Sequence, residues 1–437
     1  MANTQLHKTF SGAGNRKTFT LSFWVKRTKL STGMYVFNVG NQEANPQAGL
    51  EFQGNNTLTF WNNSGSGNKI MTTTQSFSDN NAWYHLVFSI DTTQSTASDR
   101  VKIYVNGEQI TSFSTATYPD QNYDYEWNGT QRHTIGAYYN NQSYFDGILS
   151  HIHFIDGTAY PASTFGETDA TTGEWKIKTN VTATYGTNGF FILKDGNSVT
   201  DQSGNSNNFT VAGGTLTNTE DCPSNVFATL NALDNYYAGA TLSNGNTKSV
   251  TGTNTAQVLA TIGVSTGKWY WEVKATNLPS TYGTIGICPT SPTATGNYIS
   301  SRANEYMYYS AGNLYYNGGS TGTYASYTTG DIIGVAMDLD NNRLFFSKNG
   351  TWQNSADPTT STGAYTITAP ASTDSGFYFP AVGYWDTGNG TFECNFGNGY
   401  FGTTAVTSAG TGASTPGTFE YNVPNGYQPL TTKGLNT

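Results

Sequence analysis

The chain has 437 residues, of which only 11% are charged, and its formal net charge is −9. Charged residues make up about a quarter of an average soluble protein, and no basic cluster exceeds the short run VKRTK at 25–29. We therefore expect no nucleic-acid partner, because such a partner requires a concentrated positive surface. No apolar run approaches the roughly 18 residues that cross a bilayer. The opening MANTQLHKTFSGAGNRK also lacks the apolar core of a signal peptide, so we expect neither membrane insertion nor export through a cleaved signal.

Short runs of alternating apolar and polar residues recur along the chain, separated by Gly, Asn, Asp and Pro. Closely spaced strands without a helical period predict β-sandwiches. Asn106-Gly107 and Asn349-Gly350 predict tight turns, because both residue types tolerate positive φ. The expected fold class is all-β, with two β-sandwich domains. The clearest strand runs are 18–26, 83–91, 100–108, 144–157 and 331–350.

Alternation within two strands separates a core face from an opposite face. In WYHLVFSI (83–90) the better core face holds Tyr84, Leu86, Phe88 and Ile90. GKWYWEV (267–273) raises the question whether its three aromatic rings form a sugar-stacking platform. Alternation there assigns Trp269, Trp271 and Val273 to the core and Lys268, Tyr270, Glu272 and Lys274 to the other side. The stretch therefore indicates a half-buried strand and not a sugar platform.

The three cysteines are odd in number and far apart, which argues against a disulfide framework. Cys288 and Cys394 lie in strand-like apolar contexts, so we expect buried free thiols.

A polar stretch at 195–225, with few apolar residues, marks the expected domain junction. We expect it to be ordered in part, because Phe209 and Val211 can dock. The predicted organisation is a first sandwich at 1–195, a polar connector at 196–224, a second sandwich at 225–400, and a C-terminal tail at 401–437 that packs on the second sandwich.

Each half of the chain resembles a different protein family. FTLSFWVKR, WYHLVFSID, VKIYVNGEQI and FDGILSHIHFIDGTAYP occur in the order seen in laminin-G-like, concanavalin-A-like jelly rolls, over roughly residues 1–195. GKWYWEV, IGVAMDLDNNRLFFSKNG, FYFPAVG and FECNFGN resemble the SPRY domain in its usual order. The SPRY resemblance implies a bent sandwich that binds partners through end loops and has no catalytic residues of its own.

The combination, together with the opening MANTQLHKTFSGAGNRKTFTLSFWVKR, resembles virion-surface proteins of tailed bacteriophages. This resemblance implies a structural protein on the virion surface, such as a tail-fibre or capsid appendage, assembled in the host cytoplasm. Its partners would be other capsid or tail proteins and host surface glycans or receptor proteins, and it would occur in many copies or as a homo-oligomer. The alternative is a purely structural capsid decoration or connector.

Enzymatic activity is not expected. Retaining glycosidases need two carboxylates about 5 to 5.5 Å apart, and the nearest candidates, Glu167 and Asp169, lack a third acid in step with them. The two GxSxG matches, around Ser265 and Ser320, lie between strand patterns, whereas a nucleophile elbow turns from a strand into a helix. A depolymerase remains as a rival function.

No cofactor is expected, and the metal-like patterns have simpler interpretations. His151 and His153 could share one strand face as metal ligands, but an ordinary polar face is favoured because no partner motif is near. Asp338, Asp340 and Asn342 mimic a calcium loop that lacks its Gly and its closing Glu, so a hairpin is favoured. A structural calcium ion near Asp91 or Asp146 stays open.

Ligand binding is expected at the end loops, because the sheets hold the loop roots while the tips vary. Aromatic, charge-poor loops suit glycans and protein surfaces alike, since Tyr and Trp combine a flat apolar face with a polar edge. The candidates are Tyr123, Tyr125, Trp127, Tyr138, Tyr139, Tyr144, Tyr306, Tyr308, Tyr309, Tyr315, Tyr316, Trp385 and Asp386.

Overall fold

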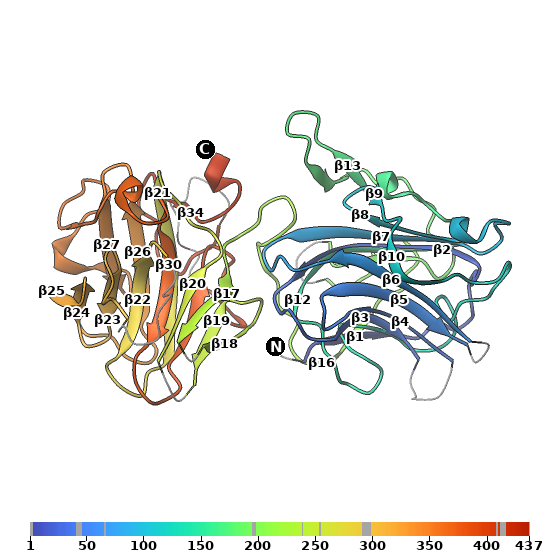
Figure 1. The fold of residues 1–437 in the computed structure, drawn as a ribbon, viewed down its shortest axis with the longest axis horizontal. Coiled ribbons are helices and arrows are strands. Elements are labelled where there is room, and N and C mark those ends of the chain that lie inside the picture. Colours follow the sequence, from blue (N-terminus) through green and yellow to red (C-terminus); the bar gives the residue numbers. More distant parts are fainter. Residues whose placement is uncertain are drawn as a thin grey trace. The chain divides into compact units, whose positions relative to one another are not determined.

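The structure, a computed structural model, describes residues 3–40, 46–64, 67–194, 198–237, 239–252, 255–290, 299–407, 410 and 417–436. It divides into two compact units, Met1–Asn218 and Thr219–Thr437, each built from mainly antiparallel sheets (Figure 1). These sheets confirm the predicted all-β fold with two sandwiches. No helix in the described ranges has the length and apolar character to cross a membrane. Helical geometry there is confined to single 3-10 turns at Ala97–Asp99, Ala162–Thr164, Gln353–Ser355, Pro370–Ser372 and Gly434–Asn436.

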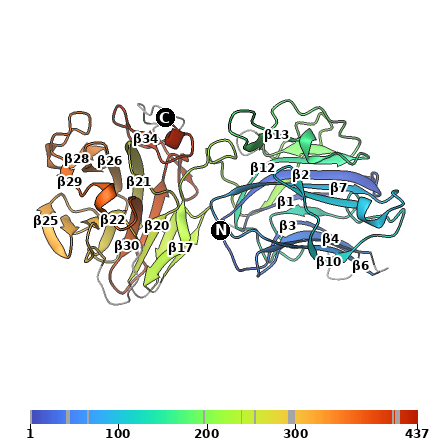
Figure 2. The same cartoon turned by 45° about the horizontal axis from the view of Figure 1, so that its top comes forward.

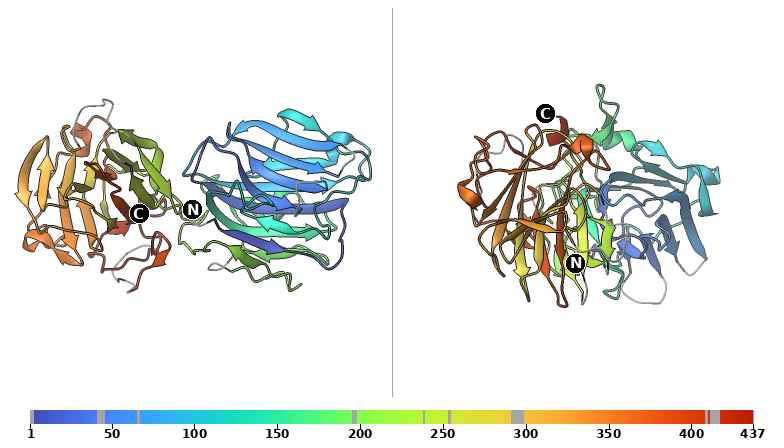
Figure 3. Two further views of the ribbon diagram at one scale, coloured as in Figure 1. Left: turned by 90° about the horizontal axis from the view of Figure 1, so that it is seen from below. Right: turned by 60° about the vertical axis from the view of Figure 1, so that its left-hand side comes forward.

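The first unit has two main sheets, named here after one strand of each. The β5 sheet has the order β10 (Phe113–Thr117), β6 (Asn68–Ser76), β5 (Thr57–Asn63), β4 (Gln47–Phe52), β3 (Met34–Val39), β11 (His133–Ile135), β1 (Gln5–Lys8) and β16 (Thr210–Gly213). The β7 sheet has the order β15 (Phe190–Ile192), β12 (Gly147–Asp156), β2 (Thr18–Arg27), β7 (Trp83–Asp91), β8 (Val101–Val105) and β9 (Glu108–Gln109). Figure 3 shows the strands of the β5 sheet side by side.

The core of the first unit lies between these sheets. Leu86, Phe88 and Ile90 of β7 are fully buried in it, and Tyr84 packs at its margin, which confirms the predicted core face. The tight turn expected after β8 is also confirmed, since Asn106 and Gly107 have φ values of 48° and 87°.

The opposite face of the β7 sheet is buried as well. Segment 158–188, which contains the hairpin of β13 (Gly166–Thr168) and β14 (Trp175–Ile177), packs on Val87 and Ile155 through Phe165 and Trp175. Figure 2 shows β13 above β12, β2 and β7, on the side away from β3 and β4. Trp175 donates its indole N–H to His85 Nδ1 at 2.9 Å. This cover keeps both faces of β7 dry.

Much of the stretch predicted as a connector belongs to the first unit. Strand β16 pairs with β1, and Phe209 is buried against Phe190 at a ring distance of 4.8 Å. Val211 on the same strand is 45% exposed. The carboxylate of Asp201 accepts backbone N–H groups from Phe191, Ser203 and Asn207. Polar side chains therefore fold this apolar-poor segment without a core of its own.

The second unit is also a two-sheet sandwich. The β22 sheet has the order β17 (Leu230–Tyr237), β20 (Ala256–Ala260), β30 (Phe379–Tyr384), β22 (Gly283–Cys288), β23 (Tyr306–Tyr309), β24 (Asn313–Tyr316) and β25 (Gly319–Thr323). The β21 sheet has the order β18 (Ala240–Ser243), β19 (Lys248–Thr251), β31 (Thr391–Asn395), β21 (Lys268–Asn277), β26 (Ile332–Asp338), β27 (Arg343–Lys348) and β28 (Thr351–Trp352), with β29 (Tyr365–Thr366) on β27 and β34 (Gln428–Pro429) on β21. A small hairpin joins β32 (Tyr400–Phe401) and β33 (Thr404–Ala405).

Strand β21 contains the aromatic stretch singled out in the sequence. Trp269, Trp271 and Val273 lie in the main core, as predicted. The other face of the strand is not the solvent side: Tyr270 and Glu272 are both 0% exposed. The alternation identified the inner face correctly, but it could not reveal that another segment covers the outer one.

The covering segment is the C-terminal tail. Phe419, Val423 and Tyr427 pack with Tyr270 on the outer face of the β21 sheet. The buried carboxylate of Glu272 accepts the backbone N–H groups of Glu420 and Tyr421 at 2.8 and 2.9 Å. Glu272 therefore fastens the tail to the strand.

The predicted hairpin at 331–350 is confirmed as β26 and β27. Asn349 and Gly350, the tight turn expected after β27, have φ values of 49° and 79°. Asp338 pairs with Lys268 at 3.0 Å instead of opening a calcium loop. Cys288 and Cys394 are buried free thiols, as expected.

Burial raises the pKa of Glu272 to about 7, although four hydrogen-bond donors oppose the rise. A carboxyl group whose folded pKa exceeds its unfolded value stabilises the fold most at low pH, and this contribution is lost as the pH rises through the folded pKa. We expect the free energy of unfolding of the second unit to fall by up to about 3 kcal/mol between pH 4.5 and pH 8.

Calorimetric unfolding of the whole chain across this pH range measures the effect. The slope should disappear in Glu272→Gln and persist in Glu220→Gln, which removes an exposed carboxylate from the same unit. An unchanged slope in Glu272→Gln would contradict the assignment.

Candidate functional site

The outer face of the β5 sheet carries polar side chains placed by strand alternation. On β5, Leu58 and Phe60 point into the core, whereas Thr59 and Trp61 point outward. Register then puts Glu51 opposite Thr59, Thr59 opposite Thr72, and Trp61 opposite Ile70. The result is a lattice of hydroxyl, amide and carboxylate groups around one indole.

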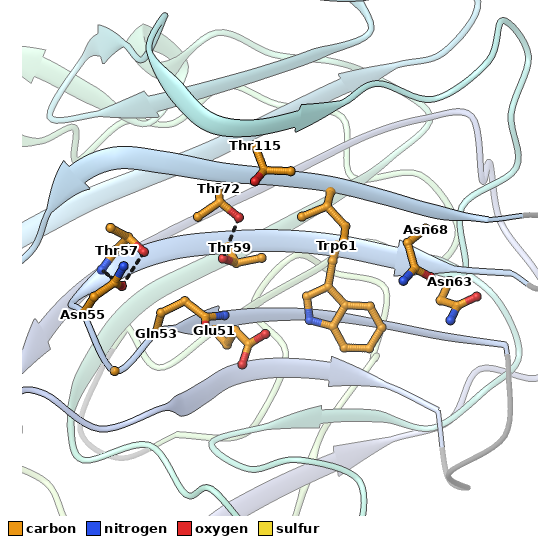
Figure 4. A pocket seen from close by; sticks show the side chains of 12 residues that line it. Glu51, Gln53, Asn55, Thr57, Thr59, Trp61, Asn63, Asn68, Thr72 and Thr115 are labelled. Atoms are coloured by element: carbon orange, nitrogen blue, oxygen red, sulfur yellow. Dashed lines mark hydrogen bonds between the residues drawn. The ribbon is translucent and has the colours of Figure 1, made fainter.

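A groove of about 610 Å³ lies on this face, and we call it the Trp61 groove (Figure 4). Its size is in the range of small-molecule sites. Thr59 and Thr72 hydrogen-bond across its floor at 3.0 Å. The lining residues are Glu51, Gln53, Gly54, Asn55, Thr57, Thr59, Trp61, Asn63, Asn68, Ile70, Thr72 and Thr115.

Trp61 lies against the sheet because the position opposite it on β4 is Gly49. A Cβ atom at Gly49 would lie 2.8 Å from the indole nitrogen of Trp61. Any side chain there would push the ring off the sheet. The missing side chain thus lets one face of the indole rest on the backbone while the ring borders the groove.

An aromatic row continues from Trp61 across the neighbouring strand. Tyr35 of β3 meets Trp61 edge to face, with ring centres 6.5 Å apart, and stacks on Tyr138 at 4.4 Å. Tyr139 contacts Tyr138 at 4.5 Å. Tyr138 also donates its hydroxyl to Gln47 at 2.9 Å. These contacts bring two predicted loop residues, Tyr138 and Tyr139, next to the groove.

Glu51 supplies the acidic group of the groove. It faces Tyr35 across the strand pair. Burial raises its pKa, and hydrogen bonds from Tyr35, Gln53 and Trp61 counteract the rise only in part. The carboxylate is thus partly removed from water, which strengthens its interactions with whatever enters the groove.

Five of the predicted binding residues are core residues and cannot contact a ligand. Asn62 points inward from β5, accepts the N–H of Glu126 at 2.7 Å and so draws the 123–127 loop over the sandwich end. Tyr125 and Trp127 then pack on Phe60. In the second unit, β23 is covered on both faces. The five buried residues are Tyr125, Trp127, Tyr306, Tyr308 and Tyr309.

The other predicted residues are half-buried. Tyr123 binds Asn62 and Ser64 through its hydroxyl, and Tyr144 forms an isolated bridge with Tyr35 beside the aromatic row. Tyr315 packs on Tyr309 and Tyr316 stacks on Tyr306. Trp385 contacts the exposed Tyr282 at 5.6 Å, and the carboxylate of Asp386 accepts the N–H of Thr387. Of the predicted binding residues, the structure therefore brings Tyr138, Tyr139 and Tyr144 together near Tyr35. The other predicted binding residues lie elsewhere.

The Trp61 groove lies on a sheet face, whereas ligand binding was expected at the end loops. A signal was present in TLTFWNN (57–63), where Leu58 and Phe60 alternate with Thr59 and Trp61. A tryptophan on the polar face of a strand is the unusual feature. Which strand lies beside it, and hence Gly49, cannot be read from the run itself.

His151 and His153 do not alternate regularly along β12. The register of β12 shifts between Ser150 and His153, and His151 has a φ of 49°, which disrupts the assumed alternation. His153 bonds the hydroxyl of Tyr185 at 2.7 Å. Burial lowers the pKa of His85 to about 3, so this ring is neutral beneath its cover.

The acidic candidates are engaged in local pairs. Lys176 lies 2.9 Å from Asp169 and 3.8 Å from Glu167. Hydrogen bonds from Lys176 lower the pKa of Asp169, the opposite of what a general acid requires. The carboxylate of Asp91 accepts bonds from Thr93 and Gln94 of its own loop. Within the described ranges, no group of three or more His, Cys, Asp or Glu is placed to hold a metal ion.

Family models match both halves of the chain. Residues 3–163 match the laminin G model of the concanavalin A-like lectin/glucanases superfamily, and residues 268–398 match the SPRY domain model. The chain therefore contains a domain of each kind, which confirms the two domain resemblances. A comparison with curated proteins finds no match.

Solved structures each resemble part of the chain. The SPRY domain of human HERC1 is 19% identical, with 38% of this chain and 96% of that one covered and a TM-score of 0.31. The heptameric SAP-like pentraxin of Limulus polyphemus is 15% identical, with 44% and 89% covered and a TM-score of 0.28. Domain 4 of AbnA, a GH43 arabinanase of Geobacillus stearothermophilus solved with arabinotriose, is 23% identical, with 34% and 65% covered and a TM-score of 0.27. At these scores the likenesses carry no argument about function.

Two glycine variants in the groove test the packing of Trp61. Gly49→Ala should lower the free energy of unfolding of the first unit by about 1 to 3 kcal/mol, because its methyl group collides with the indole. Gly54→Ala, with nothing within 4 Å of the added carbon, should stay within about 0.5 kcal/mol of the wild type. Denaturant unfolding measures both, and equal effects would contradict the described contact.

Proposed function

We propose that this chain, which contains a concanavalin A-like domain and a SPRY domain, is a non-enzymatic binding protein whose first domain takes carbohydrate in the Trp61 groove. The observation that carries the proposal is the indole of Trp61, held against Gly49 and surrounded by hydroxyl and amide side chains. A sugar ring has C–H groups on its faces and hydroxyls at its edge. It therefore stacks on an indole while its hydroxyls pair with neighbouring polar groups.

The lining favours binding over hydrolysis. Glycoside hydrolysis commonly uses two carboxyl groups on either side of the scissile bond. Among the described lining residues Glu51 is the single carboxylate, and the pair Glu167 and Asp169 is held by Lys176 elsewhere on the unit. One carboxylate suffices to accept hydrogen bonds from sugar hydroxyls, and that is the role we assign to it.

The biological setting we propose is the surface of a tailed bacteriophage particle. The support is the resemblance of the two combined domains, together with the opening MANTQLHKTFSGAGNRKTFTLSFWVKR, to virion-surface proteins. There the protein would be assembled in the host cytoplasm, contact other capsid or tail proteins, and attach the particle to host surface glycans or receptor proteins. Many copies would multiply a sub-millimolar single-site affinity through avidity.

We assign protein contacts to the SPRY domain. Tyr282, 43% exposed, lies against Trp385 and adjoins the loop of Asp386. An exposed aromatic pair beside polar groups suits a protein surface. The first domain would then bind glycan, and the second would bind protein.

Removing the indole tests the carbohydrate site. Trp61→Ala should weaken binding to the best ligand of a glycan array more than tenfold, since a central aromatic contact is typically worth about 2 kcal/mol or more. Tyr282→Ala, which removes an exposed aromatic ring from the other domain, should leave this affinity unchanged. Isothermal titration calorimetry measures both. Wild-type affinity in Trp61→Ala would refute the site.

The virion setting is tested on purified particles. The protein should be present in many copies, and antibodies to its first domain should block adsorption to host cells. A protein absent from the particles would overturn this part of the proposal. Many copies with no block of adsorption would instead favour the structural decoration role.

A further inference from the structure

The described lining of the Trp61 groove carries a negative group and no positive one. Among its described lining residues, Glu51 is the single ionisable side chain, and the rest are hydroxyl, amide, apolar or glycine residues. A ligand anion in the groove would therefore meet a carboxylate and no lining cation.

Two cations beside the groove and the aromatic row, Lys69 and Arg132, are directed elsewhere. Lys69 follows the lining residue Asn68 on β6, but it pairs with Asp120 at 2.9 Å and lies over the ring of Tyr123. Arg132, at the far end of the aromatic row, donates to the backbone carbonyl of Tyr139. Neither compensates the charge of Glu51 within the groove.

Glu51 stands within reach of a sugar stacked on Trp61. Glu51 pairs with Thr59, and Gly49 pairs with Trp61, so Glu51 and Trp61 are diagonal neighbours on one sheet face. The Glu51 carboxylate lies within hydrogen-bond reach of the Trp61 side chain, so a sugar stacked on the indole has this carboxylate at its edge. A carboxylate there accepts hydroxyl protons well but repels a second anion strongly, because burial has already removed part of its hydration.

We propose that the groove takes an uncharged glycan chain, and that Glu51 both accepts its hydroxyl hydrogen bonds and excludes chains that carry uronic or sialic acids. The inference rests on the proposed carbohydrate function and narrows its ligand class. For a surface-attachment protein it predicts neutral polysaccharides as targets and acidic capsules as non-targets.

The experiment compares the binding of one oligosaccharide in its uncharged form and in its acidic form. Neutral glucan, galactan and mannan hexasaccharides are titrated into the whole protein, and the best binder is then oxidised at its C6 positions to the uronic acid form. The neutral form should bind at least tenfold more tightly than the oxidised form. Oligogalacturonate and alginate hexamers are titrated alongside as natural acidic chains.

Two variants assign the selection to the groove. Glu51→Gln should weaken neutral binding a few-fold, because a charged acceptor is lost, and should strengthen acidic binding, so that the ratio falls toward one. Thr115→Lys, which adds a cation at an exposed lining position, should also strengthen acidic binding. Glu108→Gln, an exposed carboxylate outside the groove, should leave the ratio as in the wild type.

The outcomes separate the two proposals. Neutral binding with acidic binding of equal or greater strength would overturn the charge selection and leave the carbohydrate function standing. If the ratio of neutral to acidic binding were unchanged in both Glu51→Gln and Thr115→Lys, the charge selection would likewise be overturned and the carbohydrate function would stand. Binding of no hexasaccharide, neutral or acidic, would overturn the carbohydrate function and this inference with it.

Discussion

Packing of a second layer onto sheet faces is the constraint that shapes both units. In the first unit, segment 158–188 covers the outer face of the β7 sheet, and in the second the C-terminal tail covers the outer face of β21. Each cover needs a polar anchor, because backbone N–H groups and imidazoles buried beneath it must find partners. In the second unit, the carboxylate of Glu272 accepts a backbone N–H group of the tail. In the first unit, the indole N–H of Trp175 in the covering segment donates to the buried imidazole of His85. These covers bury the outer faces of β7 and of the first half of β21.

The outer face of the β5 sheet differs in chemistry. Its residues are Thr, Asn, Gln and Glu around Trp61, and a groove opens on it. Gly49 is what makes the aromatic ring part of the sheet surface instead of a protruding side chain. Tyr35 of β3 then contacts the ring edge to face, and Tyr138 stacks on Tyr35. A rigid sheet thus holds the aromatic and hydrogen-bonding groups, which limits the ordering entropy that binding costs.

Sequence alone was sufficient for the two sandwiches, the inner faces of β7 and β21 and the two Asn-Gly turns, because these depend on local alternation and turn chemistry. It was insufficient for the outer faces. Tyr270 and Glu272 look solvent-facing until the tail, some 150 residues later, is placed on them. The strand at 306–309 is buried on both faces, so its sequence shows no alternation of apolar and polar residues. Its tyrosines therefore look like an aromatic binding loop in the sequence. The groove was missed for the same reason: Trp61 and Gly49 meet only through strand register, which a single run does not contain.

We propose that ligand binds on a sheet face and not at the sandwich ends. A crystal structure of the chain with a bound neutral hexasaccharide tests this most directly. We expect a sugar ring stacked on the indole of Trp61, with hydroxyl groups at hydrogen-bond distance from Glu51. A sugar bound at the end loops or on the SPRY domain, with the Trp61 groove empty, would contradict it.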